Sequence, residues 1–286
     1  MRRDIADDAG GLEPGLYVVA TPIGNLGDMT LRAIETLKRA DVIAAEDTRV
    51  TATLLRHFGI GARAVAVHAH NERAAAGRIV AAIASGRSVA FVTDAGTPGV
   101  SDPGAQLVDA VRRAGQRVIP VPGASALAAA LSASGLTFDG VVFGGFLPAR
   151  GRERAERLAS LATAPWAIVL FEAPHRIART LADLYAALGA RDVIIARELT
   201  KRFETIARVP LAEARAWVEA DRDRARGEFV LVIEARPGKP QAGVPDPRAV
   251  LAALLAELPL KQAVALAARI TGERRNALYA MALDMK

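Results

Sequence analysis

The chain has 286 residues, of which 51% are hydrophobic and 24% charged, a composition that excludes a disordered protein and allows a buried core. It contains no cysteine, which excludes a disulfide scaffold, a cysteine-ligated zinc site and a cysteine nucleophile. Lys and Arg outnumber Asp and Glu by 37 to 31, and the net charge of +6 suits an anionic partner such as nucleic acid. A genome that favours Arg codons would give the same net charge, so the charge alone does not distinguish a nucleic-acid partner from a general preference for Arg.

The N-terminus begins with Met1-Arg2-Arg3 but lacks the apolar stretch that follows the basic start of a signal peptide. No apolar run approaches the roughly 18–20 residues that a membrane span needs. We therefore expect a flexible N-terminal tail over residues 1–13, a soluble protein of the cytoplasm, and no contact with a membrane.

Through the first half of the chain, apolar β-branched runs alternate with amphipathic helical patterns. Strands are predicted at residues 16–20, 42–45, 88–92 and 116–120. Leu31, Ile34 and Leu37 repeat at helical spacing after Thr30, which is a favourable N-cap residue. Strands that alternate with helices imply a mostly parallel sheet with both faces covered. We expect this N-terminal α/β domain over residues 14–124.

The second half of the chain has a different rhythm. A helix is predicted over residues 122–136, and strands at residues 141–143, 166–171, 193–196, 203–209 and 229–234. Only some of these strands have helices between them, so we expect a mixed sheet in a C-terminal α/β domain over residues 125–236. Residues 236–245 are rich in Pro and Gly and predict a linker. Only helical patterns follow, and Asp246 with Pro247 can begin the first helix of a small module over residues 246–286.

In an open α/β sheet, ligands bind at the carboxyl ends of the strands, so the loops after the predicted strands are the candidate sites. Loop 20–28 has two Gly and one Pro, and loop 93–104 has three Gly and two Pro, which lets backbone approach a ligand closely. An ordinary turn is the alternative for the first loop. Glu46 and Asp47 indicate either a polar site or the acidic start of a helix. Loop 93–104 lacks both the G-x-G-x-x-G spacing and the P-loop pattern of nucleotide sites.

Other patterns carry weaker signals. The turn 122–126 is similar to a nucleophile elbow, but Leu127 replaces its closing Gly, so we prefer a helix N-terminus that meets a ligand over a serine nucleophile. His68 and His70 could share one strand face, but no third ligand lies nearby in sequence, and we expect no metal site. Charged clusters at 171–176 and 197–204 indicate either a site or solvated loops.

Six segments, in this order, resemble the tetrapyrrole methylase superfamily and, within it, the cytidine 2′-O-methyltransferases of 16S ribosomal RNA. They are TPIGNL at 21–26, AEDTR at 45–49, TDAGTP with SDPG at 93–104, PGAS at 122–125, FEAPHR at 171–176 and RELTK at 197–201. The resemblance runs from about residue 16 to the end of the chain. It implies two α/β domains with S-adenosylmethionine in the cleft between them, and a homodimer.

The resemblance also implies which residues bind S-adenosylmethionine. They are Pro22, Ile23, Gly24, Asp94, Ala95, Gly96, Thr97, Pro98, Val100, Ser125, Ala126, Phe171, Ala173 and Phe229. A ribose 2′-hydroxyl would attack the sulfonium methyl group without a metal, and Glu172, Lys201 and Asp47 are the candidates for removing its proton. A lysine in this role would need a lowered pKa, from burial or from cationic neighbours such as Arg197 and Arg202.

Basic residues outside these loops are the candidate contacts for the RNA partner, which would be 16S ribosomal RNA or the small ribosomal subunit. They are Arg49, Arg150, Arg152, Arg154, Arg274 and Arg275. Solvated surface charge is the alternative for each of them. Two other functions remain open: methylation of a tetrapyrrole or other small molecule on the same fold, and cofactor binding without catalysis. The basic stretch and the helical module argue against a small substrate, which needs neither.

Overall fold

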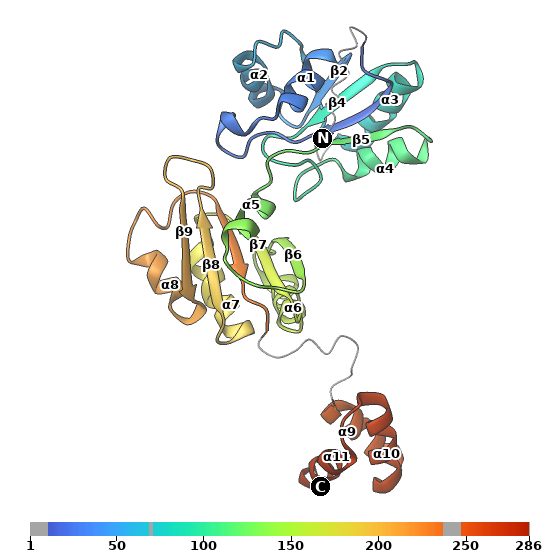
Figure 1. Cartoon of the computed structure of the whole chain (residues 1–286), viewed down its shortest axis with the longest axis vertical. Coiled ribbons are helices and arrows are strands. Elements are labelled where there is room, and N and C mark those ends of the chain that lie inside the picture. The colour runs from blue at the N-terminus through green and yellow to red at the C-terminus, as the bar shows by residue number, and fades with distance from the viewer. Residues whose placement is uncertain (1–10, 69–70, 237–246, 286) are drawn as a thin grey trace, which may run out of the picture. The chain divides into compact units, whose positions relative to one another are not determined.

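The computed structural model describes residues 11–68, 71–236 and 247–285, and the chain divides into two compact units, Met1–Arg236 and Pro237–Lys286. Most of the expected tail, His70, nearly all of the expected linker and Asp246 lie outside the described residues. Within the described residues, the first unit contains two five-stranded sheets and the second contains helices (Figure 1). The predicted fold class is thereby confirmed.

The first sheet is parallel throughout. Its strands are β1 (Gly15–Val19), β2 (Val42–Ala45), β3 (Ala64–Ala66), β4 (Ser88–Val92) and β5 (Val118–Val121), in the order β3-β2-β4-β1-β5. The predicted strands are present with small shifts at their ends. The strand β3 was not predicted, because this three-residue edge strand with an exposed Val65 contains no buried apolar run.

Helices cover both faces of this sheet. They are α1 (Leu31–Arg39), α2 (Thr48–His57), α3 (Glu72–Ala84) and α4 (Ala105–Arg113), and a short 3₁₀ helix, η1 (Leu26–Asp28), precedes α1. Alternate residues of β1 point to opposite faces: Tyr17 packs with α1 and α2, and Leu16 packs with α3 and α4. The Thr30 hydroxyl accepts a hydrogen bond from the backbone N–H of Ala33 at 3.1 Å, which confirms the predicted N-cap.

The second sheet is mixed, as predicted. Its strands are β6 (Val141–Phe146), β7 (Ala167–Glu172), β8 (Asp192–Arg197), β9 (Thr205–Pro210) and β10 (Phe229–Ile233), in the order β6-β7-β10-β8-β9. Only β6 and β7 pair in parallel, and the other neighbours are antiparallel. The last strand in sequence, β10, therefore lies in the middle of the sheet.

Two groups of helices cover the second sheet. On one face lies α5 (Ala126–Ala133), and on the other lie α6 (Gly151–Ala162), α7 (Ile177–Leu188) and α8 (Leu211–Glu219). In the structure, α5 is shorter at both ends than the helix predicted over 122–136. Ser125 has extended backbone and caps α5, because its hydroxyl accepts a hydrogen bond from Ala128 N–H, so residues 122–125 remain outside the helix.

The second unit contains α9 (Pro247–Glu257), α10 (Leu260–Thr271) and α11 (Arg275–Asp284). Leu251, Val264 and Leu278 are buried against one another, so this unit has a core of its own. None of the helices in the described parts of the chain has the length and apolar character needed to cross a membrane.

Candidate active site

Loops from three parts of the first unit are hydrogen-bonded to one another. Thr21, after β1, and Gly96, after β4, exchange two backbone hydrogen bonds of 2.8 and 3.0 Å. The Thr97 hydroxyl donates to the carbonyl of Ala124, just before α5, at 3.1 Å. The backbone of Gly96 has a φ of 76°, a conformation that favours glycine. The Gly- and Pro-rich loops of the sequence thus form one connected surface at the strand ends.

This surface forms one wall of a first cavity of about 370 Å³. The opposite wall comes from the ends of β7 and β10 in the second sheet. Predicted cofactor-binding residues that line the first cavity are Ile23, Ala95, Gly96, Thr97, Val100, Ser125, Ala126, Phe171, Ala173 and Phe229. Residues that line it without having been predicted to bind the cofactor are Ser101, Asp102, Phe146, Glu172, Pro174, Leu199, Glu228 and Val230. The volume lies in the range of sites for small molecules and cofactors.

A second cavity of about 570 Å³ adjoins the first and shares Ile23, Ala95 and Glu228 with it. Its other lining residues are Thr21, Pro22, Gly24, Leu26, Val50, Thr51, Thr53, Leu54, His57, Thr93, Asp94 and Lys201. Pro22, Gly24 and Asp94, which were predicted to bind the cofactor, therefore line the second cavity. Of all the predicted cofactor residues, which the structure describes in full, only Pro98 lines neither cavity.

Glu172 lines the first cavity, but its carboxylate is occupied by donors from the protein itself. One oxygen accepts from the Ala173 N–H at 2.8 Å and lies 3.1 Å from the Arg176 guanidinium, and the other accepts from the Thr180 hydroxyl at 2.6 Å. The residue is only 2% exposed. Glu172 is therefore a buried structural carboxylate, and the structure does not support its assignment as the proton acceptor.

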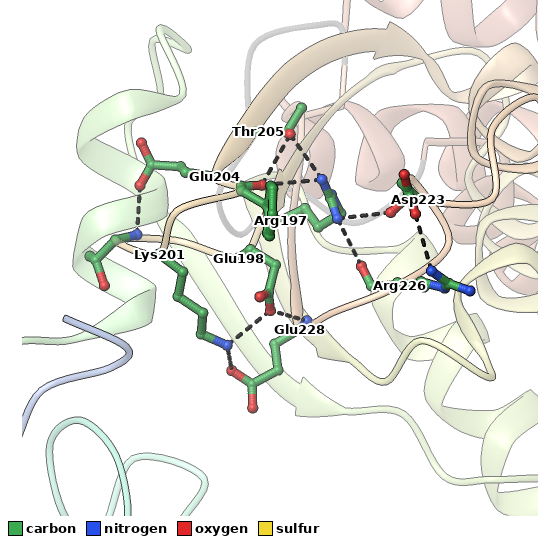
Figure 2. A network of polar contacts seen from close by, with 10 residues as sticks. Arg197, Glu198, Lys201, Glu204, Thr205, Asp223, Arg226 and Glu228 are labelled. Carbon is green, nitrogen blue, oxygen red and sulfur yellow. Dashed lines mark hydrogen bonds and ion pairs between the residues drawn. The ribbon is translucent and has the colours of Figure 1, made fainter.

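Lys201 lies between two carboxylates, and Figure 2 shows this arrangement. Its ammonium group is 2.9 Å from Glu198 and 2.8 Å from Glu228. Burial acts to lower the pKa of Lys201, but the hydrogen bonds and charges of Glu228 and Glu198 outweigh it and raise the pKa. The lowered pKa that a base at this position would need is not found, because the close neighbours of the ammonium group are anionic. The raised pKa of Lys201 does not favour a role as a base.

The loop that contains Lys201 has a strained backbone, which the surrounding hydrogen bonds hold in place. Glu198 and Thr200 are non-glycine residues with φ values of 52° and 67°. Arg197 does not face Lys201: its guanidinium donates to the carbonyls of Asp223, Arg226 and Phe203 (Figure 2). These bonds fasten the loop after β8 to the segment before β10. The stem of Lys201 packs against Gly24, where an added Cβ would lie 2.5 Å from the Lys201 Cγ.

Asp47 is the N-cap of α2 and accepts from the Arg49 N–H at 2.8 Å. Hydrogen bonds from the side chain and backbone of Arg49 lower the pKa of Asp47 to about 2. A carboxylate with so low a pKa is a poor proton acceptor near neutral pH, and Asp47 lines neither of the two cavities. Asp47 thus corresponds to the helix-start alternative, and the structure does not support its assignment as the proton acceptor.

Asp102 lies in the site although it was not predicted from the sequence as a binding or catalytic residue. It lines the first cavity, and burial, followed by the charges of Glu46 and Asp94, raises its pKa to about 6. Burial is also the largest cause of the raised pKa values of Glu46 and Asp94. The only signal in the sequence was an acidic residue inside the Gly- and Pro-rich loop 93–104.

Replacing Asp102 with Asn is expected to raise the melting temperature at pH 8 by about 2–4 °C, equivalent to roughly 1 kcal/mol in a unit of this size. The pKa of Asp102 is higher in the folded state than its ordinary value of 3.8. Its contribution to stability is therefore fully present below about pH 3.8 and is lost as the pH rises through 6. Calorimetric scans of Asp102→Asn and wild type should converge toward pH 4. Asp109→Asn, on the exposed side of α4, should show no such rise, and an equal rise in both variants would contradict the assignment.

A family model described as Tetrapyrrole (Corrin/Porphyrin) Methylases matches residues 15–215. The chain belongs to the tetrapyrrole methylase family. A second model, described as RsmI C-terminal HTH domain, matches residues 241–286. This family membership confirms the resemblance to the tetrapyrrole methylase superfamily that the six sequence segments indicated.

Curated relatives cover nearly the whole chain. A protein of Escherichia coli O157:H7 is 48% identical over 272 residues, which is 95% of each chain. A protein of Pseudomonas aeruginosa is 48% identical over 94% of this chain and 96% of its own. Both are named Ribosomal RNA small subunit methyltransferase I.

Solved structures of tetrapyrrole methylases share the fold. Cobalt precorrin-4 methyltransferase CbiF superposes with a TM-score of 0.58 at 19% identity, over 77% of this chain and 94% of its own. Uroporphyrin-III C-methyltransferase from Thermus thermophilus, complexed with S-adenyl homocysteine, superposes with a TM-score of 0.53 at 22% identity, over 77% of this chain and 97% of its own. At this identity the likeness concerns the fold alone.

The arginines predicted to contact RNA fall into two classes. Arg49, Arg150, Arg152, Arg274 and Arg275 are exposed. Arg154 is only 3% exposed, and its guanidinium donates to Asp183, to the carbonyl of Pro148 and to the Thr180 hydroxyl. The expectation that Arg154 contacts RNA is wrong: its position on α6 turns it toward α7.

Arg154→Ala is expected to lower the free energy of unfolding by roughly 2–3 kcal/mol, less than for a fully buried pair because Asp183 keeps access to water. Arg152, two residues earlier, is an exposed arginine paired with Glu156 and provides the matched control. Arg152→Ala should change stability by no more than about 0.5 kcal/mol. Urea denaturation of both variants measures this. Weakened RNA binding by Arg154→Ala without a loss of stability would contradict the structural role.

Proposed function

We propose that this protein methylates the 2′-hydroxyl of a cytidine ribose in 16S ribosomal RNA, in the decoding region of the small subunit, with S-adenosylmethionine as the methyl donor. The observation that supports it most strongly is the pair of adjoining cavities at the strand ends, since a transferase must bring donor and acceptor together. The names of the relatives and the helical unit that follows residue 236 support RNA as the substrate.

The first cavity fits S-adenosylmethionine, the cofactor of the family. Phe146 and Phe171 lie edge to face with ring centroids 5.8 Å apart and provide aromatic surface for an adenine. Glu228 provides a carboxylate for a ligand that carries a sulfonium and an ammonium group. The helix α5 begins at Ala126 with backbone N–H groups near the cavity. When bound, the cofactor supplies an electrophilic methyl group.

The residues of the chain then have two tasks. They hold the ribose oxygen, the methyl carbon and the sulfur nearly collinear, so that the C–O bond forms as the C–S bond breaks. They also accept the hydroxyl proton. We propose Asp102 for this step because its pKa of about 6 leaves it ionised yet basic near neutral pH. The single-turnover rate should then rise with pH through about 6, and a flat profile would remove Asp102 from this role.

The test of the proposed function is a transfer assay. Protein is incubated with methyl-labelled S-adenosylmethionine and, separately, with small ribosomal subunits, free 16S ribosomal RNA or a tetrapyrrole. Label in the RNA, mapped by mass spectrometry to a nucleoside methylated on the ribose, supports the proposal. Label in the tetrapyrrole alone favours the small-molecule alternative, and binding without transfer favours a cofactor-binding module. We also propose a homodimer that acts in the cytoplasm, and light scattering in solution tests the oligomeric state.

A further inference from the structure

We propose that the second cavity binds the target nucleotide of the RNA, held out of its stack, an inference that rests on the proposed function. The second cavity shares Ile23, Ala95 and Glu228 with the first, so a ligand in it lies against the cofactor cavity. Transfer requires the reacting atoms to approach to about 3–3.5 Å. Enzymes that modify a nucleotide inside a structured nucleic acid commonly extrude it into a pocket.

One wall of the second cavity is a face of α2 that the core uses only in part, because Leu54 also packs against a core cluster. Val50, Thr53, Leu54 and His57 follow the spacing i, i+3, i+4, i+7 and all line the cavity. Leu55 packs into the core beneath the sheet, whereas Val50 is 45% exposed and Thr53 and His57 are exposed as well. This face combines apolar surface with a hydroxyl and an imidazole, the combination that suits the flat face and polar edge of a base.

The wall of the cavity includes a residue whose buried hydroxyl lacks a partner. Among the described residues, Thr93 Oγ1 is buried and makes no hydrogen bond, although Thr93 lines the second cavity and is only 2% exposed. A buried hydroxyl without a partner is unfavourable, and such groups are rare in proteins. A small shift of the cavity wall on ligand binding would let a ribose or a base edge satisfy it.

Lys201, Asp94 and Glu228 line the cavity itself, and two arginines border it. Arg49 and Arg56 precede Val50 and His57 on α2, so both border the lining face, and both are exposed. Arg49 is paired with Asp47 but keeps 89% of its side chain exposed. Phosphates on either side of an extruded nucleotide would meet these guanidinium groups.

Two substitutions on neighbouring exposed positions of α2 test the proposal. Thr53→Trp places an indole in the second cavity, and Ala52→Trp places the same group on α2 outside it. We expect Thr53→Trp to lower kcat/KM for small ribosomal subunits by about 100-fold, as for a substrate held out of position. Ala52→Trp should stay within about threefold of wild type. Both should bind S-adenosylmethionine as wild type does in calorimetry.

Thr93→Val removes the unpartnered hydroxyl with little change of shape. We expect a melting temperature equal to or higher than that of wild type, together with a roughly three- to tenfold loss in kcat/KM for the RNA. A purely structural residue would not combine unchanged stability with lost activity.

The proposal is overturned if Thr53→Trp methylates the RNA as wild type does, or if it loses S-adenosylmethionine binding, since the cavity would then belong to the cofactor site. It is also overturned if both tryptophan variants lose activity equally. Failure of the wild-type protein to methylate RNA would instead refute the proposed function, so the two failures are distinguishable.

Discussion

Deleting residues 237–286 is expected to abolish methylation of the RNA while leaving the affinity for S-adenosylmethionine unchanged within about twofold. The residues that line both cavities lie in the first unit. The core of the second unit consists of its own residues, such as Leu251 and Leu278, so its removal exposes no described core cluster of the first. Calorimetry with the cofactor and a transfer assay with small ribosomal subunits measure the two quantities separately.

A finer version of this experiment concerns Arg274 and Arg275, which are exposed at the start of α11. Replacing both with Ala should weaken RNA binding. Each lost phosphate contact should reduce the slope of the salt dependence by about 0.7–0.9. Arg112 and Arg113, an exposed pair at the end of α4, provide a control of equal charge. Equal effects of both double variants would show that only net charge matters. Full activity of the deletion would contradict an RNA-binding role for the helices.

Gly96→Val is expected to weaken S-adenosylmethionine binding by at least about 100-fold. Gly96 lines the first cavity, and a Cβ at this position would lie 3.2 Å from Ile23 Cγ2, another lining atom. Its φ of 76° adds backbone strain for a β-branched residue, on the order of 1–3 kcal/mol. Calorimetric titration gives the affinity, and thermal melting reports the strain.

Gly99 separates these two effects because it lies in the same loop with a φ of 80° and has no atom within 4 Å of an added Cβ. It lines neither of the two cavities. Gly99→Val should therefore lose comparable stability but retain cofactor binding within a few-fold. Equal losses of affinity in both variants would mean that loop strain, and not contact at Gly96, reduces binding.

The sequence predicted best those features that depend on neighbouring residues. Continuous apolar runs located β2 and β4 at their exact ends, and Gly and Pro located the loops that line the cavities. Distant partners could not be predicted. The pKa of Lys201 depends on Glu228, which is 27 residues away, and the burial of Arg154 depends on Asp183, which is 29 residues away. The face of α2 that lines the second cavity could not be predicted either, because a helix with one face toward the core and another toward a cavity has the sequence pattern of an ordinary amphipathic helix.

The central position of β10 also determines when the protein can fold during its synthesis. β7 and β8 each pair with β10 (229–233) and not with each other, so both lack their shared partner until the ribosome has delivered the last strand. Phe229 and Val230 also line the first cavity. A nascent chain that ends before Phe229 therefore exposes the edges of β7 and β8, which are open to mispairing and aggregation. The first sheet is complete by Val121 and can form long before, so the emerging chain passes through a stage in which the first sheet is formed and the second still lacks its central strand.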